Sequence, residues 1–138
     1  MTTRRWAFDD ARRAAVLMRE ETMDQVCLVV PIKQGKSDAA RAFMHELETE
    51  RKGDYEASER RIGIDKEAWY LASTPAGDQL VAYMETPDFA HALATFSQSR
   101  DAFDLWFKER LDESTGLDLN HPPAGMTLPE LLSSFIAA

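Results

Sequence analysis

The chain has 138 residues, the size of one ordinary domain, and 44% of them are hydrophobic and 29% charged. Its formal net charge is −8 at pH 7, which disfavours nucleic acid as a partner because acidic proteins repel the phosphate backbone. The longest apolar run, 26–32, is far shorter than the ~20 residues that a membrane span needs. The first residues do not follow the pattern of a secretory signal, and the single cysteine, Cys27, excludes an intrachain disulfide. We therefore expect a cytoplasmic protein that binds neither nucleic acid nor a membrane.

Residues 1–22 are distinct from the rest of the sequence in charge and pattern. They carry five arginines against four acidic residues. Asp9 and Asp10 are candidate helix caps ahead of good helix formers, but the apolar side chains make only a broad face. The sequence therefore predicts an N-terminal helical extension over 1–22, followed by an α+β domain over 23–138.

The domain is expected to begin with a strand and a helix. The run 25–33 is β-branched and almost wholly apolar, which is typical of a strand covered on both faces. A turn at 34–36 precedes Ser37, a candidate N-cap for a helix that we expect over 37–61. Phe43 and Leu47 make its apolar stripe, and Gly53 marks the place for a break or bend because glycine costs about 1 kcal/mol in a helix relative to alanine.

The second half predicts a hairpin and two helices. The stretches 67–74 and 79–85 are rich in aromatic and β-branched residues and flank turn-forming residues at 75–78, the pattern of a β-hairpin. A helix is expected after Asp88, and another over 101–114, ending at Gly116. The tail, 129–137, fits either a helical face or a strand.

The expected order of elements is β-α-β-β-α-(α), and the structure of the tail decides which fold this order makes. If the tail is a strand, the chain forms the ferredoxin-like arrangement with a four-stranded antiparallel sheet. Its helices would cover one face of that sheet, while the strands are apolar on both faces. We therefore expect a second copy of the chain to cover the other face, which makes a homodimer.

Three stretches of the sequence, 32–46 (IKQGKSDAARAFMHE), 62–71 (IGIDKEAWYL) and 99–119 (SRDAFDLWFKERLDESTGLDL), carry a resemblance to known proteins, with prolines at 122–123 and PELL at 129–132. They resemble a bacterial family of uncharacterised ferredoxin-like proteins in the dimeric α+β barrel superfamily. The resemblance covers roughly 25–136. It implies a strand at the tail and a dimeric barrel, and it implies no particular activity.

A more distant similarity is to L-rhamnose mutarotase, from the same superfamily. The segment 106–108, Trp-Phe-Lys, looks like the Trp-Trp-Lys segment of that enzyme, and His45 falls where that family carries a helix histidine. Arg41 stands where the family has a tyrosine, so the catalytic set of that enzyme is not reproduced. The resemblance therefore implies isomerase-like, monooxygenase-like or binding functions without choosing among them.

Two helical side chains are candidates for chemistry. His45 is a candidate general base, although the helical wheel places it opposite Phe43, where a solvated histidine is the plainer interpretation. Arg110 falls on the apolar stripe of its helix, where a guanidinium must be paired or reach past the edge. It is a candidate anion-binding group or a structural ion pair, with Asp54 as the expected partner.

The hairpin supplies the second set of candidates. Glu67 and Trp69 share one face of the first hairpin strand, and Tyr83 and Glu85 share one face of the second. If both strands present these residues on the same face, two aromatic rings and two carboxylates line one cavity, the general form of a ligand site. The competing interpretation is that the rings belong to the core or a dimer interface. The expected ligand contacts are Glu67, Trp69, Tyr83, Trp106 and Arg110, and the candidate catalytic residues are Glu85 and His45.

Two functions remain open at the level of sequence. The first is a small-molecule binding protein or cofactor-independent enzyme with a pocket between sheet and helices. The second is a non-catalytic dimeric module for self-association or protein interaction. No spacing of histidine, cysteine and acidic residues in the sequence matches a metal site, and the sequence contains no glycine-rich phosphate loop. No histidine is a persuasive axial ligand for heme. No cofactor is therefore expected.

Overall fold

The computed structural model describes residues 23–124 and 126–137, so the helical extension expected over 1–22 lies outside the described residues. Three strands form one antiparallel sheet: β1 (Asp24–Pro31), β2 (Lys66–Thr74) and β3 (Gly77–Thr86). Their order across the sheet is β1-β3-β2. The turn at 75–76 joins β2 to β3 with Thr74 opposite Gly77, as expected for a hairpin.

The expected four-stranded ferredoxin-like sheet is wrong, because the described part of the chain forms an α+β fold with only three strands. The segment 126–137 contains neither helix nor strand, and the side chains of Leu132 and Phe135 are 85% and 89% exposed. Its apolar residues come in adjacent pairs, at 131–132 and 135–136, and do not alternate. A strand on the sheet would therefore turn one member of each pair away from the core. Pro129 also removes a backbone donor.

The first long helix is divided into two. Helix α2 (Ser37–Glu48) ends at Thr49, and α3 (Lys52–Ile62) begins after Arg51 and ends at Gly63. The break lies just ahead of Gly53, which falls in the first turn of α3. Gly63 has φ 89°, the left-handed conformation that glycine adopts without steric cost.

The remaining helices have well-defined N-terminal caps. Helix α4 (Phe89–Gln98) is capped by Asp88, whose carboxylate accepts a hydrogen bond from the backbone N–H of His91 at 3.0 Å. Helix α5 (Ala102–Thr115) is capped in the same way by Asp101. The expected end at Gly116 is confirmed, with φ 82°.

A buried polar network ties the helices together. The carboxylate of Asp104 on α5 is fully buried and accepts hydrogen bonds from Ser58, Ser99 and Arg61. Lys108, also fully buried, donates from Nζ to the backbone carbonyls of Phe96, Ser97 and Ser99 at the end of α4. These charges are stabilised by hydrogen bonds and do not need a ligand.

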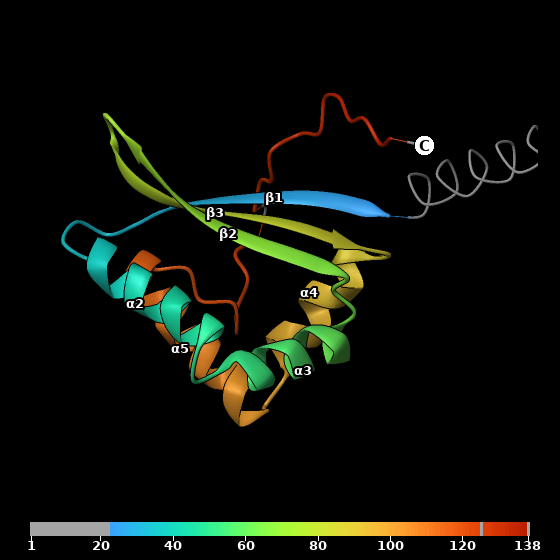
Figure 1. Ribbon diagram of the computed structural model, residues 1–138, viewed down its shortest axis with the longest axis horizontal. Helices are drawn as coiled ribbons and strands as arrows, with labels where there is room; N and C mark the ends of the chain where they lie inside the picture. The colour runs from blue at the N-terminus through green and yellow to red at the C-terminus, as the bar shows by residue number, and fades with distance from the viewer. Residues whose placement is uncertain (1–22, 125, 138) are drawn as a thin grey trace, which may run out of the picture.

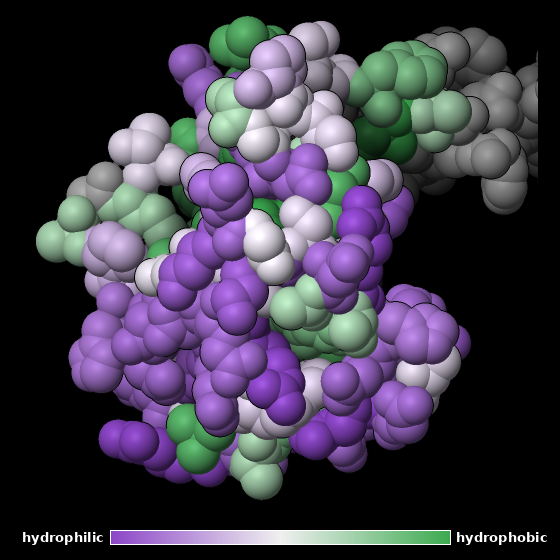
Figure 2. All heavy atoms as spheres, turned by 90° about the vertical axis from the view of Figure 1, so that its left-hand side faces the viewer, coloured by the Kyte–Doolittle hydropathy of each residue, from purple (hydrophilic) through white to green (hydrophobic). Residues whose placement is uncertain are grey.

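Helices α2 to α5 lie on one face of the sheet, and the chain after α5 crosses to the other face (Figure 1). The core between sheet and helices includes Leu28, Phe43, Leu80, Phe107 and Leu111. At the end of the molecule that carries α2, the outer surface of the helical layer is mostly hydrophilic (Figure 2). Among the described residues, no helix has both the length and the apolar character needed to cross a bilayer.

Candidate functional site

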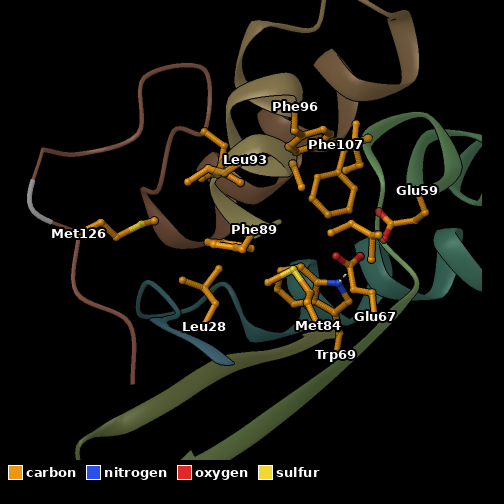
Figure 3. A pocket seen from close by; sticks show the side chains of 14 residues that line it. Leu28, Glu59, Glu67, Trp69, Met84, Phe89, Leu93, Phe96, Phe107 and Met126 are labelled. Atoms are coloured by element: carbon orange, nitrogen blue, oxygen red, sulfur yellow. Dashed lines mark hydrogen bonds between the residues drawn. The ribbon is translucent and has the colours of Figure 1, made fainter. Parts of the chain in front are cut away.

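An apolar cavity lies between the sheet and the helices, where α3, α4 and α5 meet the strands (Figure 3). Its volume is about 60 Å³, which is room for only a few atoms because one water needs roughly 10–15 Å³ on the same measure. Four aromatic rings line it, those of Trp69, Phe89, Phe96 and Phe107. Most other lining residues are aliphatic or methionine, including Met84 from β3 and Met126 from the C-terminal segment.

The cavity is polar at one end only, where two carboxyl groups meet. Glu59 reaches this end from α3 and Glu67 from β2, and Figure 3 shows their carboxyl groups pointing toward one another. Glu67 Oε2 accepts hydrogen bonds from the Tyr55 hydroxyl and from Trp69 Nε1, the latter at 3.1 Å. Within the described residues, Glu59 Oε2 is buried and meets no donor.

These contacts determine how the two carboxyl groups hold protons. Burial raises the pKa of Glu59 to about 9, and the charge of Glu67 adds to the shift. Burial also raises the pKa of Glu67, but the hydrogen bonds from Tyr55, Trp69 and Glu59 oppose that rise. Because Tyr55, Trp69 and protonated Glu59 all donate to Glu67, the negative charge of the pair belongs there, and Glu59 is the protonated member at neutral pH.

Tyr55 remains a hydrogen-bond donor throughout. Burial, with the charge of Glu67 as the next cause, raises the pKa of its hydroxyl far above the usual range. Its ring packs against Phe107, with the ring centroids 6.3 Å apart. Tyr55 therefore fixes the orientation of Glu67 and does not itself exchange protons.

A second, polar cleft lies on the solvent side of the carboxyl pair. Its volume is about 210 Å³, and Glu59, Ile64 and Glu67 line both this cleft and the apolar cavity. Arg60 and Lys66, both exposed, are the cationic residues at its rim. The pair therefore separates an apolar interior from a water-accessible cleft, so a proton leaving the pair has a polar exit.

The structure divides the four hairpin candidates between the two faces of the sheet. Glu67 and Trp69 face the helices and line the cavity. The register pairs Tyr83 with Ala68 and Glu85 with Lys66, which places Tyr83 and Glu85 on the outer face. There the Tyr83 hydroxyl donates to Glu85 Oε2 at 3.0 Å, and both residues border a hollow formed with the C-terminal segment. The expectation of one shared cavity for all four is wrong.

The helical candidates also lie outside the cavity. Arg110 forms an ion pair with Glu113 at 3.0 Å, and its side chain is 40% exposed. Its expected partner, Asp54, is instead 3.4 Å from Arg51. Trp106 packs edge-on against Phe43 and carries the Arg51 guanidinium 4.4 Å from its ring centroid.

The mutarotase-like features do not form a site. His45 is exposed on α2, as the helical wheel indicated. In the segment 106–108, only Phe107 lines the cavity, since Lys108 holds the end of α4. His45 is not among the described residues that line the cavity with the two carboxyl groups.

Sequence reasoning missed Tyr55 and Glu59. It continued the apolar stripe of α2 through 37–61, which placed Glu59 on the outer face. The break at 49–51 shifts the inward stripe of α3 to positions 55, 58, 59 and 62. The helical spacing of these four positions in the sequence was the signal available, once a second helix was assumed to begin after the break.

The two carboxyl groups can exchange a proton and form hydrogen bonds, and the rest of the cavity lining is apolar. Among the described residues, no group of three or more histidines, cysteines and acids is placed to hold a metal ion. Comparisons of this chain with protein-family models, with curated proteins and with solved structures found no match.

Proposed function

We propose that this chain binds a small, largely apolar molecule in the cavity between sheet and helices, and that Glu59 and Glu67 contact its polar end. The observation that carries this proposal is a carboxyl pair placed at one end of an otherwise apolar, aromatic-lined cavity. A protein that needed only a packed core would gain stability from an apolar side chain at position 59. The cavity volume limits the part of the molecule that is enclosed to about five non-hydrogen atoms.

The same arrangement fits a cofactor-independent enzyme of the isomerase type. A carboxyl pair that shares one proton has an acid and a base side by side, which is what a proton transfer within one substrate requires. Glu59 would donate and Glu67 would accept. Binding comes first in either case, so it is the step to test.

A matched pair of alanines on α4 provides the test. Ala92 lines the cavity and is 2% exposed, whereas Ala90 lies on the exposed side of the same helix. We expect isobutanol, which has five non-hydrogen atoms, to raise the melting temperature of the wild type and of Ala90→Leu in a saturable way, because it binds the native state alone. Ala92→Leu fills the cavity and removes the effect. If Ala92→Leu does not melt cooperatively, Leu93→Phe fills the same space.

The proposal fails if isobutanol gives no saturable shift in the wild type, or if the cavity-filling variants respond as Ala90→Leu does. A linear fall of the melting temperature in all variants would show a solvent effect without binding. That result would favour the alternative, a module whose sheet serves only for association.

We also propose a second copy of the chain as the partner of the outer sheet face. Val29 and Tyr70 lie on this face and are 40% and 61% exposed. Lys66 and Glu85 are cross-strand neighbours there, so a two-fold contact can place the lysine of one copy near the glutamate of the other. The apolar side chains of the C-terminal segment enlarge the exposed apolar surface near this face.

A further inference from the structure

We propose that the molecule bound in the cavity is a small aliphatic amine, held as an ammonium ion between Glu59 and Glu67. This inference rests on the proposed function and adds the chemical class of the ligand. It follows from the charges around the cavity, the oxygen atom of Glu59 that has no partner within the described residues, and the aromatic lining.

The cavity holds acidic groups and lacks a compensating cation. None of the described residues that line it is a lysine, arginine or histidine. Two cations of the helical layer are engaged elsewhere, since Arg61 contacts Asp104 and Asp101 and Lys108 caps α4. Arg60 and Lys66 lie at the rim of the solvent cleft. A ligand cation would therefore supply the charge that the pair lacks.

The oxygen atoms of the pair are available to an ammonium group. Tyr55 and Trp69 both donate to Glu67 Oε2. The other hydrogen bond of the Glu67 carboxylate comes from protonated Glu59, and an ammonium group that enters between the two residues takes the place of that proton. Glu59 Oε2 is buried and accepts no hydrogen bond within the described residues. An ammonium group has three donors, and charge-assisted hydrogen bonds to two carboxylates are the strongest that it forms in proteins.

The rest of the cavity suits the alkyl part of such a ligand. Trp69 and Phe107 lie close to the carboxyl end, with ring centroids 6.1 Å apart. Aromatic rings attract a cation through their negative faces and at the same time pack against methylene groups. The net charge of −8 on the whole chain favours the approach of cations and disfavours that of anions.

Binding of an ammonium ion changes the proton count of the pair. Glu59 carries a proton in the empty site, and an ammonium between the two groups favours both as carboxylates. One proton therefore leaves Glu59 for the solvent cleft as each ammonium enters, and no covalent bond in the ligand changes. The charged groups that face Glu59 are Glu67 and, from α5, Asp104; both favour its protonated form in the empty site.

The test compares three molecules of matched shape: isobutylamine, isobutanol and isobutyrate. We expect isobutylamine to bind the wild type about 10-fold to 100-fold more tightly than isobutanol at pH 8, and isobutyrate not to bind. Between pH 6 and 8, the affinity for isobutylamine should rise by about tenfold per pH unit, with release of about one proton per molecule in calorimetry. Isobutanol should show no such rise.

Two isosteric variants on α3 locate the effect. Glu59→Gln removes the titrating proton, so the pH dependence and the proton release should disappear. Glu56→Gln removes an exposed acid of the same helix that borders only the solvent cleft, and both effects should persist. Circular dichroism should establish that each variant is folded. If Glu59→Gln does not fold, the pH dependence of isobutylamine binding to the wild type still tests the proposal.

Equal binding of isobutanol and isobutylamine by the wild type would overturn the amine proposal and leave the proposed function intact. So would an affinity for isobutylamine that does not change with pH, or a pH dependence that survives Glu59→Gln. Failure of all three molecules to bind would overturn the proposed function as well.

Discussion

At the scale of single residues, the molecule contains two kinds of buried acid. Asp104 accepts hydrogen bonds from two hydroxyl groups and a guanidinium, so its charge is balanced within the protein. Glu59 has a buried oxygen that meets no donor in the described residues. Only the second kind contributes unfavourably to folding when it ionises, and this difference separates a structural acid from a candidate functional one.

The first prediction concerns the pH dependence of stability. The pKa of Glu59 is raised in the folded state to about 9 from its ordinary 4.5, so the folded state binds more protons than the unfolded state between these values. Stability from this group is therefore fully present below about pH 4.5 and is lost as pH rises toward 9, by up to about 1.4 kcal/mol per pH unit. Urea unfolding at pH 5.5, 7 and 8.5 should show that the free energy of unfolding falls less with rising pH for Glu59→Gln than for the wild type. If the free energy of unfolding depends on pH in the same way in both proteins, the prediction of a raised pKa for Glu59 is wrong.

The second prediction concerns the structural acid. Asp104→Ala leaves Ser58, Ser99 and Arg61 without their shared acceptor, so the free energy of unfolding should fall by about 2–4 kcal/mol. Glu109→Ala, on the exposed side of the same helix, should change it by less than about 0.5 kcal/mol. Equal effects in chemical denaturation would show that the network contributes nothing specific.

At the scale of elements, the break between α2 and α3 determines which side chains of α3 face the cavity. The hairpin and the helices after Asp88 could be predicted from alternation, turn residues and caps, because those signals are local. A break was expected at Gly53, but its position at 49–51 could not be predicted, since no proline or glycine occupies these residues and Gly53 falls inside the next helix. Extending one stripe across this break placed Glu59 on the wrong face and Asp54 on the core side.

The third prediction uses the two glycines of α3. Gly63 ends the helix with φ 89°, whereas Gly53 lies in the first turn without a positive φ. Neither has an atom within 4 Å of an added Cβ, so backbone conformation alone decides the outcome. Gly63→Ala should lower the free energy of unfolding by about 1 kcal/mol, and Gly53→Ala should raise it by about 0.5–1 kcal/mol. A change of the same sign at both positions would contradict this account.

At the scale of the whole molecule, the faces on which the side chains of paired strands lie were the least predictable feature. The Tyr83–Glu85 face depends on the register of β3 against β2, and a shift of one residue reverses it. The sequence showed which residues each strand contains, but it did not show which of them face the helices and which face outward. The tail was assigned to a fourth strand through a family resemblance, and its paired apolar residues instead leave it without regular structure.

The fourth prediction is that the chain is a homodimer in solution. Sedimentation equilibrium at micromolar concentration should give twice the chain mass of 15.6 kDa. Tyr70→Glu, which places a charge on the outer sheet face, should shift the protein to the monomer, because a charge buried without a partner opposes association. Ala57→Glu, on an exposed position of α3, should leave the dimer intact. A wild-type monomer would contradict the proposal directly.

The most direct test of the cavity as a binding site is methyl NMR of the methionines during a titration with isobutanol. Met84 and Met126 line the cavity, whereas Met44 packs against the core elsewhere. Binding in the cavity predicts saturable shifts of the Met84 and Met126 methyl signals with one common dissociation constant, and no shift at Met44. Absence of any saturable shift at Met84 and Met126, or equal shifts at all three, would contradict the account.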